Sequence, residues 1–168
     1  MPQPAMPAAV EPSPPGWLTP ASQQLVSKLL ATHELAFGRP LLTGLCADAT
    51  PLQWSQSLFA AATVVLAHDG ADPGGDPGPR LIYANRAALL LWRRPWAELV
   101  GMPSRHTAEP AERAGRAQAL QRVQRRHAIA DYSGIRIDSQ GRRFRISNAR
   151  VWSLPGGQAA AFSAWHWL

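Results

Sequence analysis

The sequence predicts an α+β domain, in which a five-stranded antiparallel sheet carries helices on one face and follows an N-terminal helical extension. Two observations predict this fold class. Residues 132–152 form two alternating runs on either side of a turn, a pattern typical of a β-hairpin. The expected element order is helix, helix, strand, strand, several short helices, one long helix and three successive strands. Successive strands joined by short turns pair antiparallel. The helices inserted between the second and the third strand are expected to bury their apolar sides against one face of that sheet.

The hairpin turns at residues 138–141, where the glycine accepts a positive φ. The alternation in its second strand is ambiguous. Phe144 and Ile146 share their parity with Asn148, whereas the small apolar Ala149 has the opposite parity. Either a bulge near Asn148 exchanges the two faces, or the strand mixes polar side chains with aromatic ones.

The N-terminal part of the chain is expected to change character at residue 21. Residues 1–20 hold seven prolines and almost no charge, so a disordered tail is expected there, with the domain spanning residues 21–168. Ser22 is the expected N-cap of a first helix that ends near Gly38. A second, short helix is expected over residues 51–58.

Two strands are expected next, over residues 63–68 and 81–84, because both segments are compact and rich in apolar residues. The segment 70–79 between them consists largely of Gly, Pro and Asp and is expected to form an exposed loop. Asn85 is the predicted N-cap of the following helix, and residues 95–101 are expected to form one or two helical turns.

The longest predicted helix covers about residues 109–127. Acidic side chains in its first turn and arginines in its last complement the helix dipole. Its buried stripe is expected to comprise Ala117, Leu120 and Val123. After the hairpin, a Pro-Gly-Gly turn leads into a final strand over residues 158–167.

The basic residues lie almost entirely in the second half of the chain. Residues 1–79 carry two basic and six acidic groups, whereas residues 80–168 carry fifteen arginines and five acidic groups, a net charge of +10. Arginine pairs bidentately with carboxylates and phosphates, so this half suits an anionic ligand or a nucleic acid. The alternative is that the arginines coat a solvated helix and an open sheet face.

The composition is that of one soluble globular domain with enough aromatic bulk for a core. Cys46 is the single cysteine, and a thiol without a partner favours a reducing compartment. The sequence holds no apolar run long enough to span a membrane and no secretory signal at its start. We therefore expect a cytoplasmic protein.

Residues from about 22 to 165 resemble the MEKHLA domain, a PAS-like module. The matching stretches are 83–89 with 91–92, 102–105 with 108–110, the hairpin strands 132–137 and 141–146, and the segments 149–152 and 157–162. The family occurs in bacteria and algae as a short stand-alone protein, the form that this chain resembles. It also lies at the C-terminal end of plant homeodomain–leucine-zipper transcription factors.

The resemblance implies a PAS-like fold and a sensory or interaction role, and it implies no reaction. The chain departs from the family at residues 72–79, where the family is shorter. This insertion is expected only to lengthen a loop.

A polar set tied to the family stretches supplies the candidate ligand-binding residues. These are Arg105, Glu109, Tyr132, Arg136, Arg145, Asn148 and Trp152. If they turn toward the helices, they line a pocket for a small polar or anionic ligand. The alternative is structural: Arg105 and Glu109 form a buried bridge, while Arg136 and Arg145 decorate the exposed sheet face.

Other chemistry finds little support. No phosphate-cradling glycine loop, paired-cysteine metal signature or His-Glu-x-x-His helix is present. The surroundings of Cys46 do not resemble the cysteine motif of flavin-binding photoreceptor PAS domains, and the five histidines are scattered singly. Glu109 and His106 can be written as an acid/base pair, but no nucleophile accompanies them. We therefore assign no catalytic or metal-binding residue and leave the cofactor unknown.

The sequence thus predicts a non-enzymatic PAS-like domain that binds a small polar or anionic ligand, a protein partner, or both. A homodimer is expected to form through the N-terminal helix or the open sheet face. Neither nucleic acid nor a membrane is a partner in this interpretation. The rival functions are a nucleic-acid-associated regulator that uses the arginine-rich C-terminal half, and a small enzyme with a polar pocket.

Overall fold

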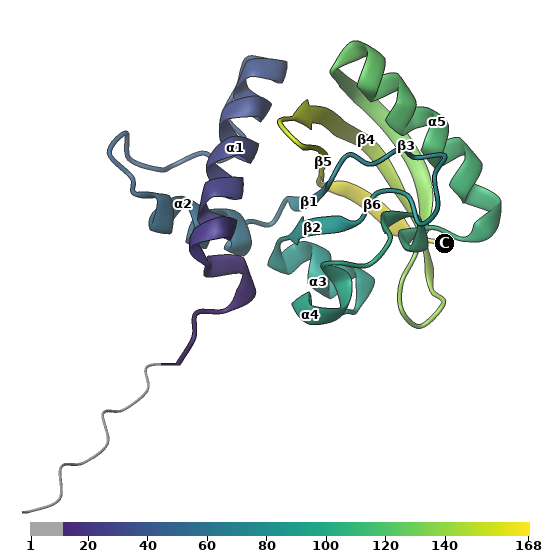
Figure 1. The fold of residues 1–168 in the computed structure, drawn as a ribbon, viewed down its shortest axis with the longest axis horizontal. Helices are drawn as coiled ribbons and strands as arrows, with labels where there is room; N and C mark the ends of the chain where they lie inside the picture. The colour runs from purple at the N-terminus through teal and green to yellow at the C-terminus, as the bar shows by residue number, and fades with distance from the viewer. Residues whose placement is uncertain (1–11) are drawn as a thin grey trace, which may run out of the picture.

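The computed structural model describes residues 12–168 and shows a central sheet between two layers of helices (Figure 1). One layer consists of α1 (Pro20–Phe37) and α2 (Pro51–Ala60). On the other side lie α3 (Arg86–Trp92) and α5 (Pro110–Arg126). Two short 3-10 helices, η1 (Gly16–Leu18) and η2 (Ser104–Thr107), precede α1 and α5. The short α4 (Trp96–Leu99) lies beside η1 and the strand β2 (Leu81–Ala84), with Leu99 in the inner core and Trp96 packed against the cluster under α1 and α2.

The sheet is antiparallel throughout, with the order β2-β1-β5-β4-β3, and a sixth strand pairs with β4. The strands are β1 (Val64–His68), β2 (Leu81–Ala84), β3 (Ala128–Ile137), β4 (Arg143–Leu154), β5 (Gly157–Phe162) and β6 (Ala164–Trp167). The predicted α+β class is confirmed. The predicted final strand is broken at Ser163, because β5 and β6 pair with different halves of β4.

A bulge in β4 resolves the ambiguous alternation of the hairpin. Tyr132 pairs with Ala149 and Gly134 pairs with Ile146, so Ser147 and Asn148 together lie opposite a single residue of β3. Asn148 adopts a φ of 53°, the left-handed conformation that such a bulge requires. The bulge therefore exchanges the faces, and Ile146 and Ala149 lie on the same side of the sheet.

The outer face of the sheet is covered by α1. Trp152 is fully buried there, and its indole Nε1 donates a hydrogen bond of 3.0 Å to Thr32 Oγ1 on α1. Its ring meets those of His33 and Phe37 edge to face, with centroids 5.0 and 5.9 Å away. The expectation of an open sheet face is therefore corrected around Trp152, where the chain's own first helix lies. The hairpin end of the sheet, with Arg143, Arg145 and the residues of β6, is exposed.

The start of α1 differs from the prediction. Thr19, not Ser22, is the N-cap, and its Oγ1 accepts from the Ser22 amide at 3.2 Å. Part of the expected tail is ordered, because Trp17 of η1 stacks on Phe59 of α2 with centroids 4.1 Å apart. Residues 1–11 of that tail lie outside the described residues.

Asn85 is the N-cap of α3, as predicted, and its side chain also connects α3 to α2 and β1. Its Oδ1 accepts from Ala88 N of α3 at 3.2 Å and from Val65 N of β1 at 3.0 Å. Its Nδ2 donates to Thr63 O at 2.7 Å and to Leu58 O of α2 at 3.2 Å. The side chain is fully buried, so it fixes α2, β1 and α3 relative to one another.

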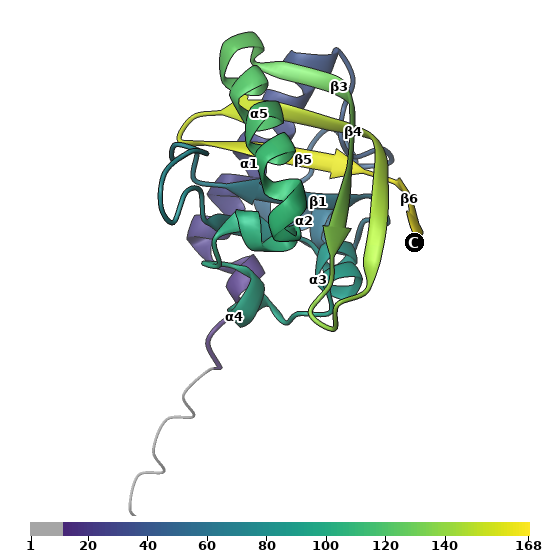
Figure 2. The same cartoon turned by 90° about the vertical axis from the view of Figure 1, so that its right-hand side faces the viewer.

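The long helix α5 crosses the inner face of the sheet (Figure 2). Leu120 and Val123 are buried as predicted, but the third position of the stripe is Arg116 rather than Ala117, which is only half-buried. The 3.6-residue period explains the difference, since positions 116, 120 and 123 stack on one side of a helix. A charged side chain thus points under α5.

Within residues 12–168, no helix has both the length and the apolar character needed to cross a membrane.

Candidate functional site

A cavity lies between α5 and the inner face of the sheet. It provides about 70 Å³ for the centres of water-sized molecules. Its polar lining consists of His68, Ser104, Thr107, Arg116, Tyr132, Arg136 and Gln158. Most of the remaining lining is apolar, with Leu66, Trp92, Ile146 and Phe162 among the larger side chains. The site is therefore an apolar chamber with a few buried polar groups, the usual construction of a small-molecule pocket.

Arg116 enters the cavity from α5. Its side chain is 8% exposed, and Nη2 donates a hydrogen bond of 2.8 Å to Ser104 Oγ in η2. Burial, followed by the nearby charge of Arg136, lowers the pKa of the Arg116 guanidinium from 12.5 to about 9. At neutral pH the Arg116 guanidinium is still charged, and this charge is buried away from bulk water.

Arg136 enters from β3 and is 6% exposed. Its Nη2 donates to the Tyr132 hydroxyl at 2.6 Å, and its Nη1 donates to Ile135 O at 2.8 Å. Gly134 lies between Tyr132 and Arg136 on the same face of the strand. A Cβ atom there would come within 2.7 Å of the Tyr132 hydroxyl and 2.9 Å of Arg136 Nη1, so glycine makes room for this pair.

Neither buried arginine has a carboxylate partner among the described residues. The ion pairs found there join Arg94 to Glu98, Arg105 to Asp76, and Arg143 to Glu109. Of the fifteen arginines in residues 80–168, Arg116 and Arg136 are the two that are buried. Uncompensated buried cations are costly for a folded protein, and they attract an anion into the space between them.

Two further polar groups lie where β1 pairs with β5. His68 and Gln158 are register partners across these strands. His68 Nδ1 accepts from Gly70 N at 3.0 Å, and burial together with the charge of Arg116 lowers the pKa of His68 to about 4. The neutral ring therefore carries its proton on Nε2. The side chain of Gln158 faces His68 and raises its pKa against the larger lowering by burial. His68 Nε2 and Gln158 Oε1 are nevertheless both buried, and neither atom completes a hydrogen bond with a described residue.

The seven candidate residues inferred from the sequence do not form one site. Tyr132 and Arg136 line the cavity. Arg145 is exposed, because it alternates with the buried Phe144 and Ile146, and Asn148 is exposed at the bulge. Trp152 packs on the opposite face against α1.

The predicted structural alternative for Arg105 and Glu109 is also corrected. The two do not bridge each other: Arg105 reaches Asp76 in the inserted loop at 2.6 Å, and Glu109 reaches Arg143 at the start of β4 at 2.5 Å. Arg136 is buried, contrary to the alternative that it decorates the exposed sheet face.

Five polar residues of the cavity escaped the sequence reasoning, namely His68, Ser104, Thr107, Arg116 and Gln158. Arg116 carried a signal, since it precedes Leu120 and Val123 at helical spacing. His68 also carried one, because it shares the parity of Val64 and Leu66 in its strand. Nothing local marks Gln158, whose position depends on the pairing of β5 with β1.

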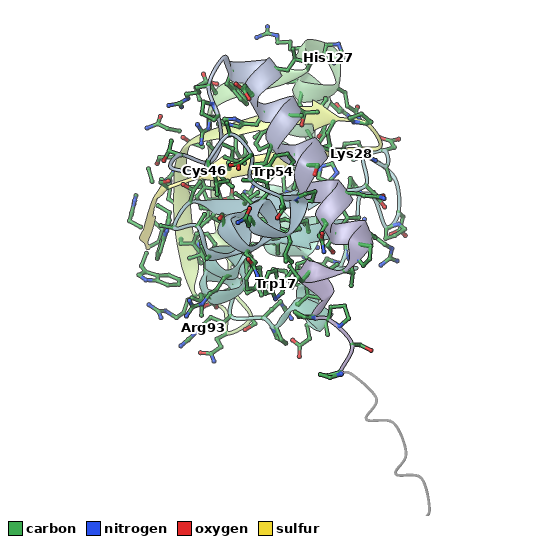
Figure 3. The ribbon with its side chains drawn as sticks, turned by 90° about the vertical axis from the view of Figure 1, so that its left-hand side faces the viewer. Trp17, Lys28, Cys46, Trp54, Arg93 and His127 are labelled. Carbon is green, nitrogen blue, oxygen red and sulfur yellow. The ribbon has the colours of Figure 1, made fainter. Side chains whose placement is uncertain are left out.

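A flavin does not fit this site. Cys46 is exposed in the loop between α1 and α2, outside the cavity lining (Figure 3). A cavity of about 70 Å³ is also several times smaller than the roughly 300–1,000 Å³ of pockets for larger ligands. Among residues 12–168, no group of three or more His, Cys, Asp or Glu side chains is placed to hold a metal ion.

Comparison with solved structures shows which class the fold belongs to. A single-residue variant of the fungal photoreceptor Vivid aligns with a TM-score of 0.53 and 13% identity, covering 88% of this chain and 97% of Vivid. A PAS domain from Colwellia psychrerythraea aligns with a TM-score of 0.51 and 11% identity, over 65% of this chain and 92% of that one. An RNA-binding light-oxygen-voltage receptor aligns with a TM-score of 0.56 and 16% identity over 73% of this chain, which spans only 35% of the receptor.

These likenesses define the class: the chain has the fold of PAS and light-oxygen-voltage domains, which confirms the predicted PAS-like architecture. The chain belongs to the MEKHLA domain family, which matches residues 23–167. No curated protein matches the sequence.

Proposed function

We propose that this protein is a non-enzymatic sensory domain that binds a small anion in the cavity between α5 and the sheet. The observation that carries the proposal is the pair of buried guanidinium groups, Arg116 and Arg136, which no described carboxylate neutralises. Arginine forks are suited to carboxylates, and a low-dielectric pocket strengthens each charged hydrogen bond. The single thiol, Cys46, is compatible with action in the cytoplasm.

The cavity residues favour binding over reaction. Arginines are permanent donors and poor proton carriers, and Ser104 Oγ accepts a hydrogen bond from Arg116 rather than lying against a base. His68 already uses Nδ1 to accept from Gly70 N. Outside the cavity, Glu109, half of the conceivable acid/base pair with His106, is paired with Arg143.

The fold provides a route from the cavity to the surface of the domain. Along β5, Gln158, Ala160 and Phe162 line the cavity, whereas Ala161 belongs to the core cluster that α1 and α2 form with the outer face. A ligand that shifts β5 is therefore expected to change the packing of α1 on the outer face. Since α1 covers the outer face, a partner protein or a second copy is proposed to engage α1 itself.

Thermal unfolding with a panel of small carboxylates, inorganic phosphate, sulfate and matched neutral amides tests the binding proposal. At least one anion is expected to raise Tm in a concentration-dependent way, since ligands that bind only the folded state stabilise it. Arg116→Met and Arg136→Met are expected to remove the effect. The matched controls are Arg122→Met, exposed on α5, and Arg145→Met, exposed on β4. A panel in which no anion binds, by Tm and by calorimetry, overturns the proposal.

A further inference from the structure

We infer that the ligand is a short-chain hydroxy acid, with a carboxylate held by Arg116 and Arg136 and a hydroxyl held by His68 and Gln158. This inference rests on the proposed function and adds the chemical class of the ligand. It follows from three features of the cavity: the buried positive charge, a donor and an acceptor that complete no hydrogen bond, and the small volume.

The buried charge favours a carboxylate. Arg116 uses Nη2 alone in a hydrogen bond to the protein, so the rest of its fork is available to a ligand oxygen. Arg136 is held by Tyr132 and by its neighbouring carbonyl, so its position is fixed before the ligand arrives. A carboxylate has all its oxygens on one side. Phosphate or sulfate would instead turn oxygens toward Leu66, Ile146 and the other apolar walls.

The donor and the acceptor favour a hydroxyl. His68 Nε2–H is a buried donor and Gln158 Oε1 is a buried acceptor; the two side chains face each other, but neither atom completes a hydrogen bond. A hydroxyl accepts from the first and donates to the second, so one group satisfies both. A second carboxylate would meet the Gln158 oxygen, and an ammonium group would meet the His68 N–H and the charge of Arg116.

The size of the cavity favours a short molecule. Gln158 Nε2 donates at 3.1 Å to the carbonyl of Leu120 on α5, so the Gln158 side chain is held in place at the cavity wall. A space of about 70 Å³ for molecular centres, against at least roughly 10–15 Å³ for one water, holds about five to seven non-hydrogen atoms. This volume fits an acid of about two to four carbons.

The test compares each hydroxy acid with its deoxy counterpart on the purified full chain, by calorimetry. The pairs are lactate with propionate and 3-hydroxybutyrate with butyrate; inorganic phosphate and sulfate are the competing anions. At least one hydroxy acid is expected to bind about tenfold more tightly than its deoxy partner, because the latter leaves two buried polar atoms unmatched. In Gln158→Met the ratio of the two dissociation constants is expected to fall toward one, whereas in Arg122→Met, exposed to solvent on α5, the ratio is expected to stay unchanged.

The outcomes separate this inference from the proposed function. Equal binding of both members of every pair, or tighter binding of phosphate or sulfate, overturns the hydroxy-acid inference and leaves an anion sensor. Such equality would also show that His68 and Gln158 satisfy each other. Absence of binding by every anion overturns the proposed function as well.

A second measurement does not depend on the folding of Gln158→Met. The ring nitrogens of His68 are followed by NMR in the unsubstituted protein. The Nε2 resonance is expected to move with the hydroxy acid and to stay in place with its deoxy partner. A resonance that moves equally with both overturns the inference.

Discussion

At the scale of single residues, Arg116 and Arg136 carry the functional argument because they are unfavourable for folding alone. Each is more than nine-tenths buried, and the charge of Arg136 adds to burial in lowering the pKa of Arg116. A fold under selection for stability alone replaces such groups with apolar ones. Their presence in the cavity is therefore informative about binding.

Replacing Arg116 with methionine is expected to stabilise the ligand-free protein. Methionine fills a similar volume without a buried charge, so the free energy of unfolding should rise by about 1–2 kcal/mol even though the hydrogen bond to Ser104 is lost. Urea unfolding at neutral pH measures the change, with Arg122→Met as the exposed control on the same helix. A large loss of stability would show that Arg116 is structural.

Gly134 offers a way to disturb Arg136 without replacing it. In Gly134→Ala the added methyl meets the ends of two flexible side chains, Tyr132 and Arg136, rather than backbone. The unfolding free energy is therefore expected to change by less than about 1 kcal/mol, while anion affinity falls at least tenfold because the guanidinium is displaced. Calorimetric titration alongside urea unfolding separates the two effects. Unchanged affinity would contradict the assigned role of the Tyr132–Arg136 pair.

At the scale of elements, buried caps and bulges decide how helices and strands are joined. Asn85 is the clearest case, since one amide serves α2, β1 and α3. Asn148 is another. Its left-handed backbone conformation forms the bulge that exchanges the two faces of β4, so that Ala149 and Val151 line the cavity. Both residues act on the arrangement of elements rather than on a ligand.

Asn85→Ala is expected to lower the free energy of unfolding by about 3 kcal/mol, because it removes a cap and leaves several buried backbone groups without partners. The control is Thr50→Ala, which removes the exposed N-cap of α2 and should cost about 1 kcal/mol. Chemical unfolding of both variants gives the comparison. Equal losses would mean that Asn85 is only a helix cap.

At the scale of the whole molecule, helices cover the centre of the sheet on both sides, and a neutral histidine is buried on each side. Burial comes first among the causes that lower the pKa of His33, under α1, and of His68, in the cavity, each to about 4. Nearby arginines, Arg150 for His33 and Arg116 for His68, act in the same direction. Asp69 opposes the shift of His68.

The stability of the protein is therefore expected to fall as the pH drops from about 6.5 toward about 4. In this range the unfolded chain binds protons that the folded chain rejects, so acid favours unfolding. A pKa lowered from 6.5 to about 4 corresponds to about 3 kcal/mol for each histidine. Urea unfolding between pH 4 and 7.5 should show this slope, and His33→Leu should reduce it by about half. A slope that the substitution leaves unchanged would assign the effect to other groups.

The sequence by itself determined the elements of this protein and its class. Alternation and a turn glycine predicted the hairpin of β3 and β4, an Asn before an apolar run predicted the start of α3, and helical spacing predicted α5. These signals are local, because capping and periodicity depend on residues within a few positions of each other. The same local order was enough to predict an antiparallel sheet with inserted helices.

Only the tertiary structure decided which side chains form the site. Arg105 and Glu109 flank the start of α5, but their partners, Asp76 and Arg143, come from elsewhere in the chain. Arg136 turns into the cavity while Arg145 stays in solvent. A long charged side chain takes its direction from the space and partners that distant elements provide, and a single sequence does not display those partners. For that reason the residues of the proposed anion site come together only through the packing of α5 on the sheet.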